Sequence, residues 1–207
     1  MLLPYKSFNN EKFSIQAACD EVGRGSLAGR LYVASVIWNP MIIDGLVCEI
    51  KDSKKLSIIK RKELSEYIKE NAIDYSINYM ESYEIDKSNI LKCTLETMHK
   101  CLDDLTVEFD NIIIDGNNFN KYEKNNKIIP HECIIGGDNK YIGIAAASIL
   151  AKVAHDEHMH LIYLEYPVYD WNNNMGYGSK KHIEAIKIYG ITKYHRKSYK
   201  PIKQFLL

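Results

Sequence analysis

The chain has 207 residues, of which 46% are hydrophobic and 26% charged, and its formal net charge is +0, so it is an ordinary globular protein without an overall basic excess. Its length predicts one domain, no apolar run reaches the ~18 residues of a membrane span, and the start, MLLPYKSFNNEKF, lacks the pattern of a secretory signal. The five cysteines form no C-x-x-C pair, which predicts reduced, buried thiols in a cytoplasmic protein rather than disulfides or a zinc site.

The first half of the chain alternates strand-like and helix-like segments. Apolar runs predict buried strands, and apolar residues at helical spacing predict amphipathic helices, with Ser53 or Ser57 as the cap of the first helix. We expect strands at FSIQAAC (13–19), RLYVASVIW (30–38) and IDYSINYM (73–80), and helices at 56–71 and within 82–105.

In the second half, strands and helices follow one another in turn. We expect strands at 109–118 and 128–139, helices at 142–166 and 179–190, and an irregular basic tail to residue 207. The alanines of the 142–166 helix form a small face suited to close packing on a sheet, and Gly190 is a candidate C-cap. A chain that begins with strands and later alternates helices with strands is typical of a mixed α/β domain with one central sheet.

Positive charge is concentrated in two segments. Residues 180–203 hold eight basic residues and one acid, and residues 51–62 hold six basic residues and one acid. Two basic segments on an otherwise acidic chain favour a localised phosphate-binding surface, although solvated lysine faces give the same pattern.

Four acidic residues stand where predicted strands end, namely Asp20, Glu21, Asp115 and Asp138. Strand ends that lie side by side would bring these carboxylates together, and such a cluster repels itself unless a cation neutralises it. Oxygen ligands without nearby histidine or cysteine favour Mg²⁺ or Mn²⁺ over zinc and point to phosphoryl-transfer chemistry. Each acid taken singly is also compatible with a turn or a helix cap.

Two loops and one aromatic residue add candidate phosphate or sugar contacts. Gly23 and Gly25 allow close approach of the backbone to a ligand, and Arg24 between them adds a charged fork. Ser53, Lys54 and Lys55 precede a helix and could clamp a phosphate. Tyr177 lies between two glycines, where its ring could stack on a base or sugar, or belong to the core.

Six motifs in order resemble the ribonuclease HII family over residues 15–203. They are CDEVGRGSLAG, DSKKL, IIIDGN, GGDNKYIGIAAASILAKVAHD, MGYGSKKHIEAIKIYGIT and YHRKSYKPIK. The resemblance implies an RNase H-like fold, a mixed central sheet flanked by helices. It also implies a single catalytic domain with a core at about 13–170 and a C-terminal substrate-binding segment at about 171–207.

The family resemblance implies an endoribonuclease. It implies cleavage of RNA in RNA/DNA hybrids and on the 5′ side of single ribonucleotides in duplex DNA. The reaction would use two Mg²⁺ or Mn²⁺ ions and leave 3′-hydroxyl and 5′-phosphate ends. We expect a cytoplasmic monomer that binds duplexes and no membrane.

The resemblance also assigns roles to residues. Asp20, Glu21, Asp115 and Asp138 correspond to the metal-binding acids, the Gly23–Arg24–Gly25 loop to the reader of the 2′-hydroxyl, and Tyr177 to the junction-sensing tyrosine. Further expected substrate contacts are Ser53, Lys54, Lys55, Ser148, Lys152, Arg196 and Lys197.

The chain departs from the family pattern at a few positions. Ser26 and Arg30 stand where proline is common, Met175 where a basic residue is common, and His155 where arginine is common. Asp156 is a rival for the fourth acid, but it falls inside the 142–166 helix, whereas Asp138 follows the Gly-Gly turn.

Other functions stay open at this point. A related nuclease that cuts DNA, such as a junction resolvase, and a nucleic-acid binder without turnover would share the basic segments. No long N-terminal domain precedes the motifs, which argues against ribonuclease HIII. Gln204 followed by Leu207 is faintly similar to a sliding-clamp peptide, but the segment is short.

Overall fold

The computed structural model describes residues 2–4 and 15–206 and is built on a five-stranded sheet with the strand order β3-β2-β1-β4-β7. β2 runs antiparallel to β1 and β3, whereas β1, β4 and β7 run parallel to one another. The carboxyl ends of β1, β4 and β7 therefore meet at one edge of the sheet. The bounds of these strands are β1 Gln16–Val22, β2 Leu31–Ile37, β3 Asp74–Met80, β4 Asn111–Asp115 and β7 His131–Ile134.

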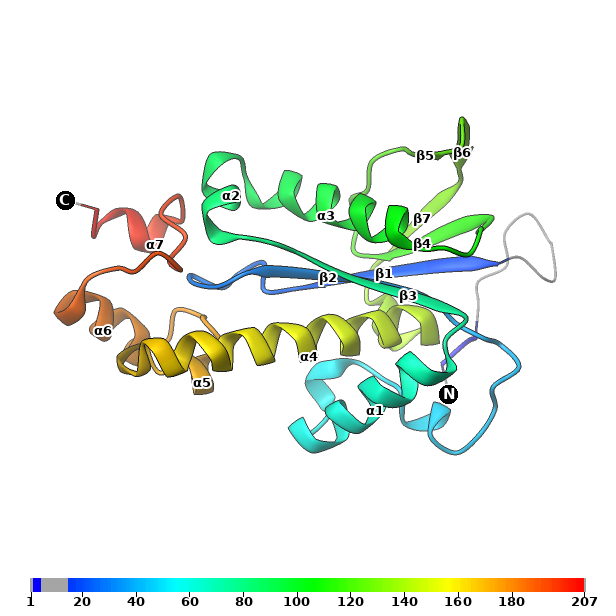
Figure 1. Ribbon diagram of the computed structural model, residues 1–207, viewed down its shortest axis with the longest axis horizontal. Coiled ribbons are helices and arrows are strands. Elements are labelled where there is room, and N and C mark those ends of the chain that lie inside the picture. The colour runs from blue at the N-terminus through cyan, green and yellow to red at the C-terminus, as the bar shows by residue number, and fades with distance from the viewer. Residues whose placement is uncertain (1, 5–14, 207) are drawn as a thin grey trace.

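Helices cover both faces of the sheet (Figure 1). The long helix α4 and helix α1 lie below it in that view, α2 and α3 lie above it, and α5, α6 and α7 gather at the end opposite the N-terminus. The helix bounds are α1 Ile58–Asn71, α2 Ser82–Lys87, α3 Ile90–Asp104, α4 Ile142–Glu165, α5 Trp171–Asn174, α6 Lys180–Tyr189 and α7 Lys200–Lys203. Short 3-10 turns are η1 Val47–Glu49, η2 Ser53–Lys55, η3 Gly137–Asn139 and η4 Pro167–Tyr169.

The small residues of α4 allow it to lie close to the sheet. Ala145, Ala146 and Ala147 are fully buried in one core cluster with residues of β2 and α1. A Cβ added to Gly143 would come within 2.8 Å of the Cβ of Ala18 on β1, so this position has no room for a side chain. The predicted small face is thus confirmed.

A separate apolar cluster joins the C-terminal segment to the rest of the molecule. Trp171 of α5, Ile186 of α6 and Ile202 of α7 pack with Met159 of α4 and Leu27 from the loop after β1. This cluster places the loop after β1 beside the C-terminal segment, although the two are about 150 residues apart in the chain.

One predicted strand is divided in the structure. The segment 128–139 is expected to form a single strand, but β6 Lys127–Ile129 pairs with β5 Tyr122–Lys124 in a hairpin, and β7 begins after Pro130. Proline has no N–H and interrupts the ladder at that point. Asn125 and Asn126 form the hairpin turn, with φ of 53° and 60°. Two adjacent asparagines are a sequence signal of such a tight turn. The hairpin was nevertheless not among the expected elements.

The remaining elements agree with the predictions apart from their ends. Segment 82–105 holds two helices, because Asn89 caps α3 by accepting from the amide of Lys92. Ser57, the second of the two candidates, caps α1. The tail is not wholly irregular, since α7 forms at Lys200–Lys203. Residues 13 and 14 of the predicted strand 13–19 lie outside the described residues.

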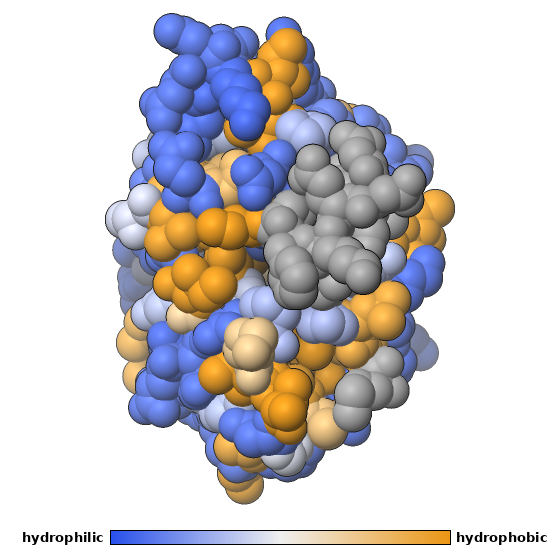
Figure 2. Space-filling model, turned by 90° about the vertical axis from the view of Figure 1, so that its right-hand side faces the viewer, coloured by the Kyte–Doolittle hydropathy of each residue, from blue (hydrophilic) through white to orange (hydrophobic). Residues whose placement is uncertain are grey.

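The cysteines and the surface complete the description. All five cysteines are free thiols; Cys19, Cys93 and Cys101 are buried, but Cys48 is exposed, against expectation. No described helix is long and apolar enough to cross a membrane. At the end of the molecule where the N-terminus lies, hydrophilic and hydrophobic residues are mixed over the surface (Figure 2).

We expect Gly143→Val to destabilise the fold by about 3 kcal/mol or more, because the added atoms collide with β1 and overpacking costs this order of free energy. The measurement is the free energy of unfolding by urea. Gly45→Val is the matched control, since a Cβ added there would have no atom within 4 Å, and it should change stability by less than about 0.5 kcal/mol. Equal stability losses for the two variants would contradict the close packing of α4 on the sheet.

Candidate active site

Parallel strands bring the four predicted acids to one edge of the sheet. Cys19 of β1 pairs with Ile114 of β4, so the next residues, Asp20 and Asp115, stand side by side. Asp115 in turn pairs with Ile134 of β7, and Asp138 follows in the 3-10 turn η3. The prediction that these strand ends meet is therefore correct in the structure.

All four acids line a single cleft of about 410 Å³. The cleft also contains most of the other residues predicted from the sequence to contact substrate. They are Gly23, Arg24, Gly25, Ser53, Lys54, Ser148, Lys152 and Tyr177. Lys55, Arg196 and Lys197 do not line it.

Backbone and side-chain donors orient the carboxylates. The amide of Glu21 donates to Asp20 Oδ1 at 2.7 Å, and the amide of Gly137 donates to Asp115 Oδ1 at 2.7 Å. Asn139 Nδ2 donates to Asp138 Oδ1 at 2.8 Å. Each of these three acids thus has one oxygen fixed by a local donor.

The electrostatics of the cleft disfavour the charged acids. Burial, followed by the nearby charges of Glu21 and Asp115, raises the pKa of Asp20 well above its usual range. Burial also raises the pKa of Glu21, partly opposed by Arg24, which donates to Glu21 Oε1 at 3.1 Å. The pKa of Asp138 is raised by burial and by the charges of Asp52 and Asp115. Partly buried anions crowd one another here, and a bound cation would relieve the repulsion.

The donor set suits a hard divalent cation. The acids supply carboxylate oxygens, and Ser53 Oγ and Ser148 Oγ, 3.0 Å apart and buried, supply hydroxyls nearby. Within residues 2–4 and 15–206, no three histidine, cysteine or acidic side chains converge closely enough to form a preassembled metal centre. The residues fit Mg²⁺ or Mn²⁺ by donor type and charge.

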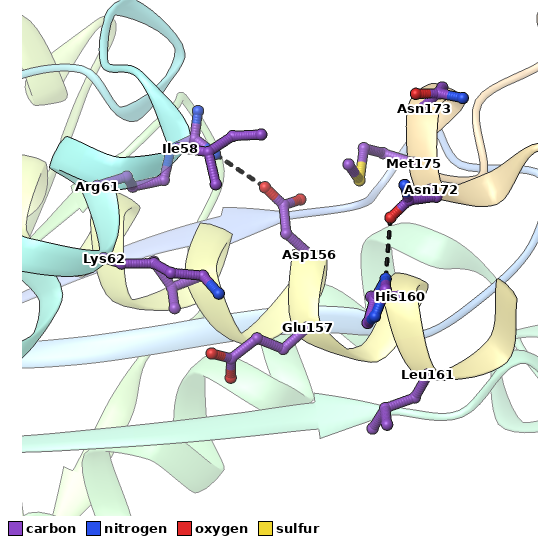
Figure 3. A pocket seen from close by; sticks show the side chains of 11 residues that line it. Ile58, Arg61, Lys62, Asp156, Glu157, His160, Leu161, Asn172, Asn173 and Met175 are labelled. Atoms are coloured by element: carbon purple, nitrogen blue, oxygen red, sulfur yellow. Dashed lines mark hydrogen bonds and ion pairs between the residues drawn. The ribbon is translucent and has the colours of Figure 1, made fainter. Parts of the chain in front are cut away.

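Asp156 lies outside this cleft. It accepts from Arg61 Nη1 at 2.8 Å and from Lys152 Nζ at 2.6 Å. It lines a different cavity, of about 590 Å³ between α1, α4 and α5, where its carboxylate points toward Arg61 (Figure 3). Of the two candidates for the fourth acid, only Asp138 shares the cleft with Asp20, Glu21 and Asp115.

The two glycines of the loop after β1 lie in close contacts, and Gly23 has no room for a side chain. Gly23 has φ of 90°, and a Cβ there would lie 2.8 Å from His155 Cδ2 and 2.9 Å from the carbonyl oxygen of Arg30. A Cβ on Gly25 would lie 3.3 Å from Cε1 of Tyr177. Tyr177, 44% exposed, therefore stands directly against Gly25 at the wall of the cleft.

The segment Ser53–Lys55 presents one lysine to the cleft and turns the other away. Asp52 accepts from the amide of Lys54 at 3.0 Å, and Arg61 Nε donates to the carbonyl of Ser53 at 3.0 Å, which fixes the turn. Lys54 is exposed and lines the cleft, whereas Lys55 Nζ donates to Asn139 beside it.

The prediction that Arg196 contacts a duplex is wrong. Its side chain is fully buried and donates to backbone carbonyls of the loop after β1, so it has no access to a phosphate. A basic residue in a basic tail gave no local signal of this burial, because the contacts join segments 167 to 172 residues apart. Lys197, in contrast, is exposed, and its amide donates to Asp86.

Three residues near the site were missed by sequence reasoning. His182 Nδ1 lies 2.9 Å from the carbonyl oxygen of Tyr177, and His182 Nε2 lies 3.1 Å from His195 Nε2. Tyr199 Oη donates to the carbonyl of Arg24 at 2.6 Å. The only signal available in the sequence was their position within motifs of the resemblance.

We expect Asp156→Asn to lower stability at pH 7 by about 3 kcal/mol, because the buried Arg61 cation loses its partner. Burial acts to raise the pKa of Asp156, but bonds from His155 and Lys152 lower it overall. A lowered folded pKa means that the carboxylate stabilises the fold above its unfolded pKa of about 3.9. The difference between wild type and variant should shrink as pH falls through the folded pKa.

Urea unfolding from pH 7 to pH 3 measures this difference. Glu66→Gln is the control, because its side chain is 68% exposed and pairs with Lys69 on the same helix, so it should change stability by less than about 0.5 kcal/mol. A loss for Asp156→Asn that stays constant over the whole pH range would show that its carboxylate is not the stabilising group.

Comparison of the sequence with known proteins identifies similar proteins in one family. The family described as Ribonuclease HII matches residues 17–202. A protein of Christiangramia forsetii named Ribonuclease HII is 47% identical over 194 residues, covering 94% of each chain. Another with that name, from Bacteroides thetaiotaomicron, is 45% identical over 199 residues, covering 96% of this chain and 94% of its own.

Solved structures share the fold at low sequence identity. Ribonuclease H2 from Pyrococcus horikoshii aligns with a TM-score of 0.77 and 22% identity, covering 92% of this chain and 96% of that one. Bst-RNase HIII, solved in complex with Mn²⁺, aligns with a TM-score of 0.71 and 19% identity, covering 96% of this chain and 70% of that one. These likenesses confirm the predicted fold, a mixed sheet flanked by helices.

Proposed function

Because this chain belongs to the ribonuclease HII family, we propose that it cleaves RNA in RNA/DNA hybrids and on the 5′ side of single ribonucleotides in duplex DNA. Members of the family are ribonucleases H, so the chain is a hydrolase that acts on nucleic acid and depends on a divalent metal. The observation that carries the proposal is the single cleft in which four carboxylates, the Gly23–Gly25 loop and Tyr177 meet.

Asp20, Glu21, Asp115 and Asp138 would hold two Mg²⁺ or Mn²⁺ ions. When bound, such ions supply an activated water and stabilise the leaving 3′-oxygen, which leaves 3′-hydroxyl and 5′-phosphate ends. The carboxylates balance the charge of the ions, and the donors from Glu21, Gly137 and Asn139 fix their orientation before substrate arrives.

The loop after β1 would identify the sugar. A 2′-hydroxyl is the group that separates RNA from DNA at one nucleotide, and backbone groups held in a rigid turn recognise it without losing side-chain entropy. The ring of Tyr177 against Gly25 would then stack on the adjoining sugar, so that both neighbours of the scissile phosphate are contacted from one wall of the cleft.

Phosphates of the duplex would be bound without regard to sequence. Ser53, Lys54, Ser148 and Lys152 reach the cleft and can hold the scissile strand near the acids. Lys55 and Lys197 are exposed outside the cleft and stay predicted contacts to more distant phosphates.

The proposal also covers the partners of the protein, its oligomeric state and its location. One structural neighbour is the PCNA:RNase HII complex from Archaeoglobus fulgidus, with a TM-score of 0.73 and 22% identity over 90% of this chain and 95% of that one. In this chain the weak clamp-like pattern begins at Gln204, whose side chain donates to the carbonyl of Pro201, and ends at Leu207, outside the described residues. A clamp partner, a monomeric state, a cytoplasmic location and the division at about residue 170 stay predictions.

Asp20→Asn should lower the rate of cleavage of a duplex with one ribonucleotide by about a thousandfold, because a metal site supplies several kcal/mol of transition-state stabilisation. Duplex binding should persist. Thermal stability without metal should rise, since the variant removes a buried charge that its neighbours repel. The assay compares Mg²⁺, Mn²⁺ and chelator, with Glu66→Gln as the active control.

The matched substrate is the same duplex without the ribonucleotide. Cleavage of the all-deoxy duplex at a similar rate would indicate a DNA nuclease. Cleavage of neither duplex by the wild-type protein, with any of the metals, would indicate a binder without turnover. Wild-type activity in Asp20→Asn would overturn the metal assignment.

Lys54→Ala should weaken binding of ribonucleotide-containing and all-deoxy duplexes by the same factor, because phosphate contacts carry no sequence or sugar information. The slope of log affinity against log salt should become shallower by about 1. Fluorescence anisotropy between about 50 and 200 mM salt measures both. Lys69→Ala, on the exposed face of α1 and paired with Glu66, is the control that should leave the slope unchanged.

A further inference from the structure

A buried arginine lies behind the loop that faces the cleft. The guanidinium of Arg196 is fully buried and held by four hydrogen bonds. Nε and Nη2 donate to the carbonyl of Gly29 at 3.1 Å and 3.0 Å, and Nη1 donates to the carbonyl of Arg24 at 3.0 Å and to Tyr199 Oη at 2.9 Å. The forked cation therefore joins the first and last parts of the loop after β1.

The charge of Arg196 is held without a matching anion. No carboxylate lies within salt-bridge distance of it among the residues that the structure describes. Its partners are two backbone carbonyls and the hydroxyl and ring of Tyr199, and burying a cation in this way is costly for stability compared with an apolar side chain of the same shape. Three of its four hydrogen bonds go to the loop after β1, so this side chain acts on the position of that loop.

The geometry of the peptide gives that role. No cis peptide bond occurs in the described chain, so the carbonyl of Arg24 and the N–H of Gly25 point in opposite directions. Arg196 Nη1 and Tyr199 Oη both donate to the Arg24 carbonyl, which therefore faces the C-terminal segment, and Gly25 itself lines the cleft. The same two contacts consequently direct the Gly25 N–H away from Arg196 and Tyr199.

We propose that Arg196 is the positioning residue for ribonucleotide recognition, because it fixes the Arg24–Gly25 peptide so that the Gly25 N–H donates to the 2′-hydroxyl in the cleft. The proposal rests on the proposed function, since it assigns the source of its sugar preference. A lysine cannot replace this arginine, because one ammonium lacks the planar fork that reaches the carbonyls of Gly29 and Arg24 together.

His195, the residue before Arg196, lies beside His182, which contacts the carbonyl of Tyr177 at the wall of the cleft. His195 Nδ1 accepts from the amide of Thr192 at 2.9 Å, which places the His195 proton on Nε2, 3.1 Å from His182 Nε2; that nitrogen of His182 accepts from Trp171 Nε1 at 3.0 Å. His182 Nδ1 then donates to the carbonyl of Tyr177. Burial lowers the pKa of both histidines, that of His195 to about 3, which keeps them neutral.

The C-terminal segment thus contacts two backbone carbonyls at the wall of the cleft, that of Arg24 through Arg196 and that of Tyr177 through His182. The backbone of this segment is itself joined to the loop, since the amide of Arg196 donates to the carbonyl of Leu27 at 2.8 Å and the amide of Gly29 donates to the carbonyl of Tyr194 at 3.0 Å. A change at Arg196 should therefore alter the loop locally while the acids on the strands keep their positions.

The test is the binding preference for a ribonucleotide in the absence of turnover. Dissociation constants are measured by fluorescence anisotropy in EDTA for two duplexes that differ in one 2′-hydroxyl, and their ratio is the preference. Arg196→Lys should lower the preference at least about fivefold, the value of one net hydrogen bond, and change the affinity for the all-deoxy duplex less than twofold. Tyr199→Phe, which removes the second donor to the Arg24 carbonyl, should lower the preference about two- to threefold.

Arg61→Lys is the matched control. Arg61 is also a buried arginine that donates to backbone carbonyls, but it supports the Ser53–Lys55 turn, so its substitution should weaken binding of both duplexes alike and keep the preference. A general loss of packing at Arg196 would behave in the same way as this control.

The outcomes separate the inference from the proposed function. A wild-type protein that binds both duplexes equally overturns the proposed sugar recognition and the inference with it. A wild-type preference that survives unchanged in folded Arg196→Lys overturns the inference alone. If circular dichroism shows that Arg196→Lys is unfolded, Tyr199→Phe decides, and an unchanged preference in that variant overturns the inference.

Discussion

The crowding of carboxylates at one sheet edge is the constraint on which the rest of the structure depends. Asp20, Asp115 and Asp138 come to the same place because β1, β4 and β7 are parallel and adjacent, and their charges raise one another's cost of ionisation. Only a rigid frame holds such groups together in the absence of a cation. The fully buried residues of the strands and the close approach of α4 to β1 supply that rigidity.

Helix α4 contributes residues both to the cleft and to a contact with α1. Ser148 and Lys152 line the cleft, whereas Asp156 bonds to Arg61. Eight helical residues span about 12 Å and rotate the side chain by about 80°, so Asp156 is too far along the axis to join the other acids. The Arg61–Asp156 pair instead connects α4 to α1 and, through the Ser53 carbonyl, supports the turn that presents Lys54.

Backbone groups recognise a ligand only if the loop that carries them is held in place by the rest of the protein. A glycine loop can approach a sugar closely. Its backbone is also conformationally free, so its amides keep one position only if other segments hold the loop in place. Here the C-terminal segment supplies the fixing contacts, through Arg196 and Tyr199 to the Arg24 carbonyl and through His182 to the Tyr177 carbonyl. The apolar cluster around Trp171 and Ile202 holds that segment against the end of α4.

The sequence by itself predicted the main helices, the sheet strands apart from the division at Pro130, and the acids Asp20, Glu21 and Asp115, because apolar periodicity and strand-end position are local properties that tertiary packing did not override. It also indicated Tyr177 and the glycine loop through ordered motifs. It could not separate a surface base from a buried one: Arg196 and Lys197 are neighbours of the same charge, yet one is enclosed and the other exposed. Only the tertiary structure decided this, and decided between Asp138 and Asp156, because burial and ion pairing depend on partners that lie up to 172 residues away.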